Sequence, residues 1–173
     1  MEDVADAAGV TKPVVYDHFG SKDGLLCALI DRAADELHRR TVAAVDGVVD
    51  PYDALQRGVR AYFETMDRRD GVWWALLDAT AAVSPATLEA VDVARTRQAA
   101  WIADLIAAQL PPSGRRAADR RRALIYAHVV VGACERLATL RTGQPGLSVT
   151  AVTRHVLDVL WLGFDRLQAA PGD

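Results

Sequence analysis

Apolar residues recur along this chain at the three- and four-residue spacing that places side chains on one face of a helix. The clearest case follows Ser21, where positions 25, 29, 33 and 37 are apolar and charged residues fill many of the places between. No stretch shows four or more clean apolar–polar alternations bounded by turn residues, which half-buried strands require. The pattern therefore predicts an all-α protein.

Glycine, proline and hydroxyl residues divide the chain into helices. Gly9 suits a helix end in the left-handed backbone region, and Thr11, Ser21 and Ser148 are good N-caps. Two short helices come first, over 2–8 and about 12–19. The expected longer elements are Ser21 to about Val45, Asp50–Met66, a short apolar stretch Val72–Leu77, Ser84 to just before Pro111, Arg120–Leu140 and Ser148–Leu167.

The first two helices are joined by a turn of a few residues that contains Gly9, with Val10 as a single apolar plug. Two short helices joined in this way are typical of a helix-turn-helix DNA-binding unit. We therefore expect residues 1–45 to form a DNA-binding region with its connecting helix. Residues 46–173 are expected to form a helical bundle for ligand binding and dimerisation.

Three elements of the first 26 residues carry a resemblance to a known family. They are the turn Ala5-Asp6-Ala7-Ala8-Gly9-Val10, the helix ending Tyr16-Asp17-His18-Phe19, and the entry Ser21-Lys22-Asp23-Gly24-Leu25 into the next helix. In this combination the segment resembles the DNA-binding end of the TetR family of repressors. The resemblance implies a transcriptional regulator, most simply a repressor that a small-molecule effector releases from operator DNA; an activator stays an open alternative.

A recognition helix enters the major groove by its N-terminal end, so its first residues face base edges and nearby phosphates. Hydroxyl, ammonium, imidazole and phenol groups reach phosphate or base atoms, and an apolar side chain suits a thymine methyl group. Phe19 is expected in the core, and Tyr16 is equally suited to core or surface. The candidate DNA-binding residues are Thr11, Lys12, Pro13, Val14, Tyr16, His18 and Lys22.

Charge weakens this DNA-binding prediction. Residues 1–23 sum to −3, and Lys12 and Lys22 are the only lysines in the chain. The family's DNA-binding domain also has a complete helix before the position of Glu2, where the first predicted helix of this sequence begins. We therefore expect an N-terminally truncated chain, or one begun at a misassigned Met, that binds operator DNA poorly. Loss of that helix is expected to expose Val4, Ala8, Val15 and Leu25.

The last two predicted helices carry apolar residues on more than one face, and Gly132, Ala133 and Gly163 permit close backbone approach. Surplus apolar surface suggests a partner. By resemblance, these helices pair with those of a second copy as a four-helix homodimer interface. The alternative is a helix pair buried within a monomer.

Aromatic side chains with one polar edge can line an apolar cavity and orient a ligand. Such side chains are equally common in a helical core. The pocket assignment is therefore a hypothesis about the candidates as a group, and any one of them can be a core residue instead. The expected ligand is a small apolar or aromatic effector. The candidate pocket residues are Tyr62, Met66, Trp73, Trp74, Trp101 and Tyr126.

Other chemistries find little support in the sequence. There is no Gly-rich phosphate loop, nucleophile elbow or paired-cysteine motif, so an enzyme is not expected, nor is a cofactor. The four histidines never pair at helical spacing, and Cys27 and Cys134 lie far apart, so no metal site is expected. Without a secretory signal or an apolar window long enough to span a bilayer, a cytoplasmic protein is expected. The competing hypothesis is a helical dimeric ligand-binding module that no longer reads DNA.

Overall fold

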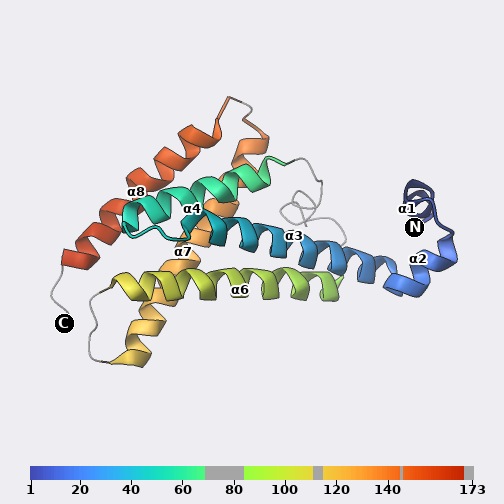
Figure 1. Ribbon diagram of the computed structural model, residues 1–173, viewed down its shortest axis with the longest axis horizontal. Coiled ribbons are helices and arrows are strands. Elements are labelled where there is room, and N and C mark those ends of the chain that lie inside the picture. Colours follow the sequence, from blue (N-terminus) through green and yellow to red (C-terminus); the bar gives the residue numbers. More distant parts are fainter. Residues whose placement is uncertain (69–83, 111–114, 145, 170–173) are drawn as a thin grey trace. The chain divides into compact units, whose positions relative to one another are not determined.

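The computed structural model describes the backbone of residues 1–68, 84–110, 115–144 and 146–169, and side chains as far as residue 163. Within these ranges the chain forms helices and no strands, which confirms the all-α prediction (Figure 1). The short apolar stretch expected over 72–77 lies outside the described residues. The helices are α1 Glu2–Ala8, α2 Lys12–Phe19, α3 Lys22–Val45, α4 Pro51–Met66, α6 Pro85–Gln109, α7 Arg116–Thr142 and α8 Val149–Ala169.

Local capping chemistry explains where several helices begin. Ser21 Oγ accepts the Gly24 amide at 3.0 Å, and Ser148 Oγ accepts the Ala151 amide at 3.1 Å, so two of the predicted caps are confirmed. Thr11 occupies the N-cap position of α2 with extended backbone, but its side chain makes no capping hydrogen bond. The hydroxyl that was predicted to cap α2 therefore does not satisfy a backbone amide there.

Helix α7 begins at Arg116, four residues before the predicted start at Arg120. Ala117 and Ala118 extend the helix backward because alanine and arginine both have high helix propensity. The basic run is therefore part of the second turn of α7, and the first two turns carry most of its positive charge.

The chain divides into two compact units, to both of which α3 and α6 contribute. The first comprises residues 1–35 and 71–94, and so contains α1, α2 and the N-terminal parts of α3 and α6. Its core places Ile30, fully buried, against Val91, with Leu26 and Ala90 packed around them. The N-terminal parts of α3 and α6 are thus held together by apolar contacts.

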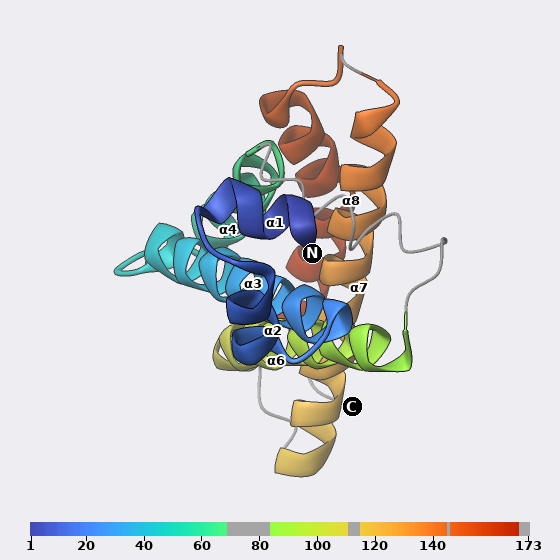
Figure 2. The ribbon, with the colours of Figure 1, turned by 90° about the vertical axis from the view of Figure 1, so that its right-hand side faces the viewer.

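The second unit comprises residues 36–70 and 95–173. Helix α4 packs against α7 and α8, and α7 packs against α8 (Figures 1 and 2). Phe63 and Met66 of α4 are among the most deeply buried side chains, at 0% and 1% exposure. Between α6 and α7 the core is built largely of small residues, which let two helices approach closely: Ala99, Ala103, Ala123, Ala127 and Val131.

An ion pair closes the end of α4 against the end of α7. Arg141 donates two hydrogen bonds to the carboxylate of Asp67, at 2.7 and 2.9 Å, and a third to the Leu147 carbonyl at 3.0 Å. Its guanidinium also lies 5.8 Å from the centre of the Phe63 ring. Bidentate arginine–carboxylate geometry fixes direction as well as distance, so this residue orients the turn that leads into α8.

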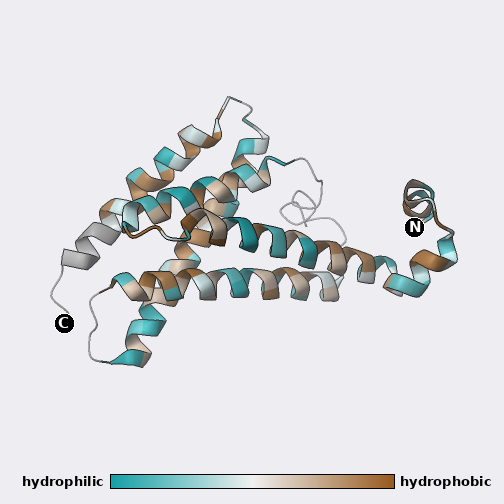
Figure 3. Ribbon diagram, in the orientation of Figure 1, coloured by the Kyte–Doolittle hydropathy of each residue, from teal (hydrophilic) through white to brown (hydrophobic). Residues whose placement is uncertain are grey.

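Hydrophobic and hydrophilic segments alternate along the helices (Figure 3). On α7 the buried face is opposed by an exposed face that still carries apolar residues, Ile125 at 56% and Val129 at 52% exposure. On α8 the exposed apolar residues are Val159 and Leu162, at 75% and 66%. The predicted surplus of apolar surface on the last two helices is therefore present.

Helix α7 is also long and apolar enough to meet the composition criterion for a membrane span, with a window of mean hydropathy 1.4 that is 33% buried. The expectation that no window reaches that length and hydropathy was wrong. Core helices of soluble bundles meet the same criterion, and α7 packs its alanine face on α6. One such helix is a weak signal for a membrane.

Candidate DNA-binding surface and ligand site

Helices α1 and α2 pack against each other across a turn of residues 9–11. Gly9 adopts φ 66°, a left-handed conformation that glycine reaches without strain. The Val10 amide then donates to the Ala5 carbonyl at 3.0 Å, which closes the turn. Ala5 and Val15 are the buried residues of the two helices, at 2% and 4% exposure. This geometry confirms the helix-turn-helix arrangement that the sequence predicted.

All seven predicted DNA-binding residues are exposed. Val14 is 50% and Tyr16 42% exposed, so neither is held in the core. Val15, expected to be exposed, is instead the buried residue of α2, the helix that packs against α1. Leu25, also expected to be exposed, is half-buried, whereas Val4 and Ala8 are exposed as expected. Helix α2 thus exposes Lys12, Pro13, Val14, Tyr16 and His18, together with Asp17, which was not among the candidates.

Two acidic residues lie close to this surface. Glu2 Oε2 is 3.6 Å from Lys12 Nζ, and both side chains are largely exposed. Asp17 follows Pro13 by one helical turn and is also exposed. His18 and Phe19 stack edge to face, with ring centres 4.6 Å apart and Phe19 half-buried. An exposed ion pair contributes little to stability, so Lys12 can exchange Glu2 for a phosphate at small cost.

The predicted effector-pocket residues do not come together as one described cavity. Tyr62 and Met66 are core residues of α4, at 9% and 1% exposure. Trp101 is half-buried on α6, with its ring centre 5.4 Å from that of His38. Trp73 and Trp74 lie outside the described residues. Of the described candidates, Tyr126 on α7 lines a described cavity.

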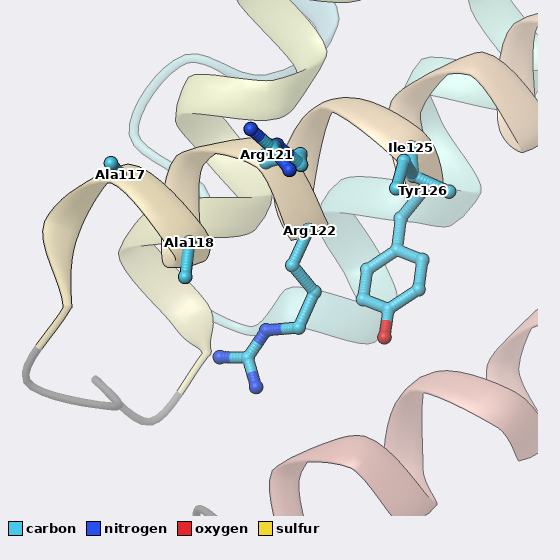
Figure 4. Close-up of a pocket in the computed structure, with 6 residues that line it drawn as sticks. All are labelled: Ala117, Ala118, Arg121, Arg122, Ile125 and Tyr126. Atoms are coloured by element: carbon cyan, nitrogen blue, oxygen red, sulfur yellow. The ribbon is translucent and has the colours of Figure 1, made fainter.

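That cavity has a volume of about 370 Å³ and follows the first turns of α7. Figure 4 shows Arg122 and Tyr126 extending from the same side of the helix. Its lining residues are Ala117, Ala118, Arg121, Arg122, Ile125 and Tyr126. The site therefore combines apolar, aromatic and cationic groups, whereas the sequence led us to expect an aromatic and apolar one.

A buried polar network joins α3 to α6 and was missed by sequence reasoning. Gln98, 9% exposed, donates to Thr41 Oγ1 at 3.2 Å, and its side-chain oxygen lies 3.1 Å from His38 Nδ1. Thr41 in turn donates to the Leu37 carbonyl at 2.9 Å. These residues are about 60 positions apart along the chain, and no local pattern links them. Arg95 and Glu135, also unpredicted, form an ion pair at 2.8 Å between α6 and α7.

Burial alters two acid groups in the second unit. It raises the pKa of the Tyr62 phenol well above its usual value, and Cys134 and Glu135 add to the effect. It also raises the pKa of the Cys134 thiol to about 12, with a further contribution from Glu135. Both groups therefore stay neutral at physiological pH, as core residues require.

Comparison with known proteins finds matches to two separate segments of the sequence. Residues 1–29 match bacterial regulatory proteins of the tetR family. Residues 51–163 match the tetracyclin repressor-like C-terminal domain. The chain belongs to the TetR family. It is a TetR-family transcriptional regulator, and regulators of this family bind operator DNA and small-molecule effectors and form dimers.

Individual relatives support the assignment. The chain is 30% identical over 106 residues to the HTH-type transcriptional activator FasR of Mycolicibacterium smegmatis, covering 61% of this chain and 48% of that protein. It is 28% identical over 164 residues to the HTH-type transcriptional regulator EthR of Mycobacterium tuberculosis, covering 92% of this chain and 73% of that protein. The match to FasR thus spans about half the length of that relative. These relatives are regulators rather than enzymes.

A solved structure shares the fold. The crystal structure of a transcriptional regulator from Rhodococcus sp. Rha1 superposes with a TM-score of 0.74 at 19% identity, and covers 98% of this chain and 87% of that one. At this level of identity the likeness concerns the arrangement of helices alone.

Proposed function

We propose that this protein represses its target genes by binding operator DNA through α2, and that a small molecule bound in the second unit releases it. The observation that carries the DNA-binding part is the exposure of every residue assigned to DNA on α2 and at the start of α3. Thr11, Lys12, Pro13 and Val14 would face base edges, and Tyr16, His18 and Lys22 would contact phosphates. Its place of action would be the cytoplasm.

We further propose that two copies pair through α7 and α8. Val129, Val159 and Leu162 are more than half exposed on these helices, and such a patch is rarely left open to water. A two-fold axis through this patch would give the pair two α2 helices and therefore a palindromic operator. The proposed division of labour places DNA binding in residues 1–45 and ligand binding and dimerisation in 46–173.

Selection from random double-stranded DNA tests the proposal without knowledge of the operator. The full chain is expected to enrich a palindromic sequence. Because the first 23 residues sum to −3, we expect weak affinity, and selection is best run near about 50 mM salt, where phosphate contacts contribute most.

Variants of the selected complex assign the contacts. Lys12→Ala and Lys22→Ala should each weaken binding and lower the salt slope by about 1, since each removes one phosphate contact. Arg57→Ala, at an exposed position of α4, is the matched control and should bind as the parent does. A folded dimer that enriches no sequence would contradict DNA reading and favour the alternative, a dimeric ligand-binding module.

Transcription from a promoter that carries the selected sequence gives the direction of control. A repressor lowers transcript yield when added and restores it with effector. Increased yield would instead show an activator, the role named for the FasR relative.

A further inference from the structure

The first turns of α7 carry the most concentrated positive charge in the sequence. Residues 115–122 include five arginines and a single acid, Asp119, in a chain whose net charge is −3. Figure 3 shows this end of α7 as largely hydrophilic. Asp119 lies 3.5 Å from Arg122 and offsets part of its charge. Among the described residues Arg121, which is exposed, has no ion pair, so the surface stays cationic.

The cavity along this segment adds shape to the charge. Its lining runs from Ala117 and Ala118, which leave room, through Arg121 and Arg122 to the apolar side chain of Ile125 and the ring of Tyr126 (Figure 4). A volume of about 370 Å³ lies at the lower end of the range of small-molecule sites. Cationic groups lie at one end of the cavity, and an aromatic, apolar surface lies one turn further on. This arrangement is complementary to a molecule that has an anionic group at one end and an apolar, aromatic part at the other.

We propose that this cavity binds a small aromatic anion, with its carboxylate or phosphate against Arg121 and Arg122 and its ring beside Ile125 and Tyr126. Guanidinium groups donate paired hydrogen bonds that match the oxygens of either anion. This proposal rests on the proposed function and specifies the chemical class of its effector. The pocket is amphipathic, whereas the sequence predicted an apolar one.

Calorimetric titration of the full chain at pH 7, without DNA, tests the site with three probes of one shape. These are 2-naphthoate, 2-naphthyl phosphate and the neutral 2-naphthol. Both anions are expected to bind at least about tenfold more tightly than the naphthol, since a charge-assisted hydrogen bond accounts for at least that factor. The tighter of the two anions identifies the preferred head group. Equal binding of the naphthol would overturn the proposal, as would the absence of binding by either anion.

Variants separate this site from general attraction to positive charge. Arg121→Gln combined with Arg122→Gln should reduce anion affinity by about tenfold and leave naphthol binding unchanged. The lysine versions, Arg121→Lys with Arg122→Lys, should retain much of it. Arg120→Gln, in the same run but outside the lining, is the control. An equal loss in that control would refute a specific site.

Two further outcomes are decisive. If the double glutamine variant changes only the monomer–dimer equilibrium by sedimentation, with no effect on naphthoate, the cavity belongs to the interface between copies and the proposal fails. Naphthoate binding by a chain that selects no DNA would uphold this site and reject the proposed DNA reading. DNA selection without naphthoate binding would do the reverse.

Discussion

Single residues in this protein divide into those whose role follows from local chemistry and those whose role depends on distant partners. Gly9 belongs to the first group, because a short turn between helices needs a left-handed residue, and φ 66° is observed. Tyr62 and Met66 belong to the second. Their residue types suit a ligand pocket or a core equally, and burial at 9% and 1% assigns them to the core.

Phe63 provides the clearest test of core packing. Its side chain is fully buried beneath Arg141, so Phe63→Ala should lower the free energy of unfolding by about 3–5 kcal/mol through lost burial and a residual cavity. Denaturant unfolding followed by circular dichroism measures the change. Val49→Ala, at a side chain 88% exposed, is the control and should stay within about 0.5 kcal/mol of the parent. Similar losses in both variants would show that Phe63 is not a core residue.

At the scale of helices, sequence reasoning performed well where the signal is local. Ser21 and Ser148 cap the helices they were expected to cap, and the all-α class holds throughout the described residues. The start of α7 was misplaced because the basic run was taken for a helix beginning, whereas Ala117 and Ala118 already continue the helix. Contacts between helices could not be predicted in this way. The ion pair of Arg141 with Asp67, for example, joins two residues that are 74 positions apart in the sequence.

The hydrogen-bond network around Gln98 allows one such contact between helices to be tested. Gln98→Ala should lower the free energy of unfolding by about 1–3 kcal/mol, because Thr41 and His38 lose a buried hydrogen-bonding partner. Urea unfolding measures the loss. Gln109→Ala, at the exposed end of the same helix, should have almost no effect. A Gln98 variant as stable as the Gln109 variant would mean that the network contributes no net stability.

At the scale of the whole molecule, the exposed apolar face of the last two helices is the feature that a single chain leaves unsatisfied. Val159 and Leu162 are exposed one turn apart on α8, next to the polar groups of His155 and Asp158. Such a face is expected to be covered by its counterpart in a second copy.

Introducing charge on that face tests the dimer. Val159→Asp and Leu162→Glu should each raise the dimer dissociation constant by about tenfold or more, because an unpaired carboxylate would be buried at the interface. Sedimentation velocity over a concentration series measures this constant. Val93→Asp places the same charge on an exposed residue of another helix, α6, and should leave assembly unchanged. Dimers that persist in both α8 variants would require another interface.

The sequence by itself determined the helical class, most helix boundaries and the helix-turn-helix, because each depends on contacts between residues only a few positions apart. Only the tertiary structure decided which aromatic residues are core, which polar residues meet across α3 and α6, and which side chains line a cavity. Those outcomes depend on helix packing between segments that are distant in the chain. Periodicity shows that a helix has an apolar face, but not what lies against it.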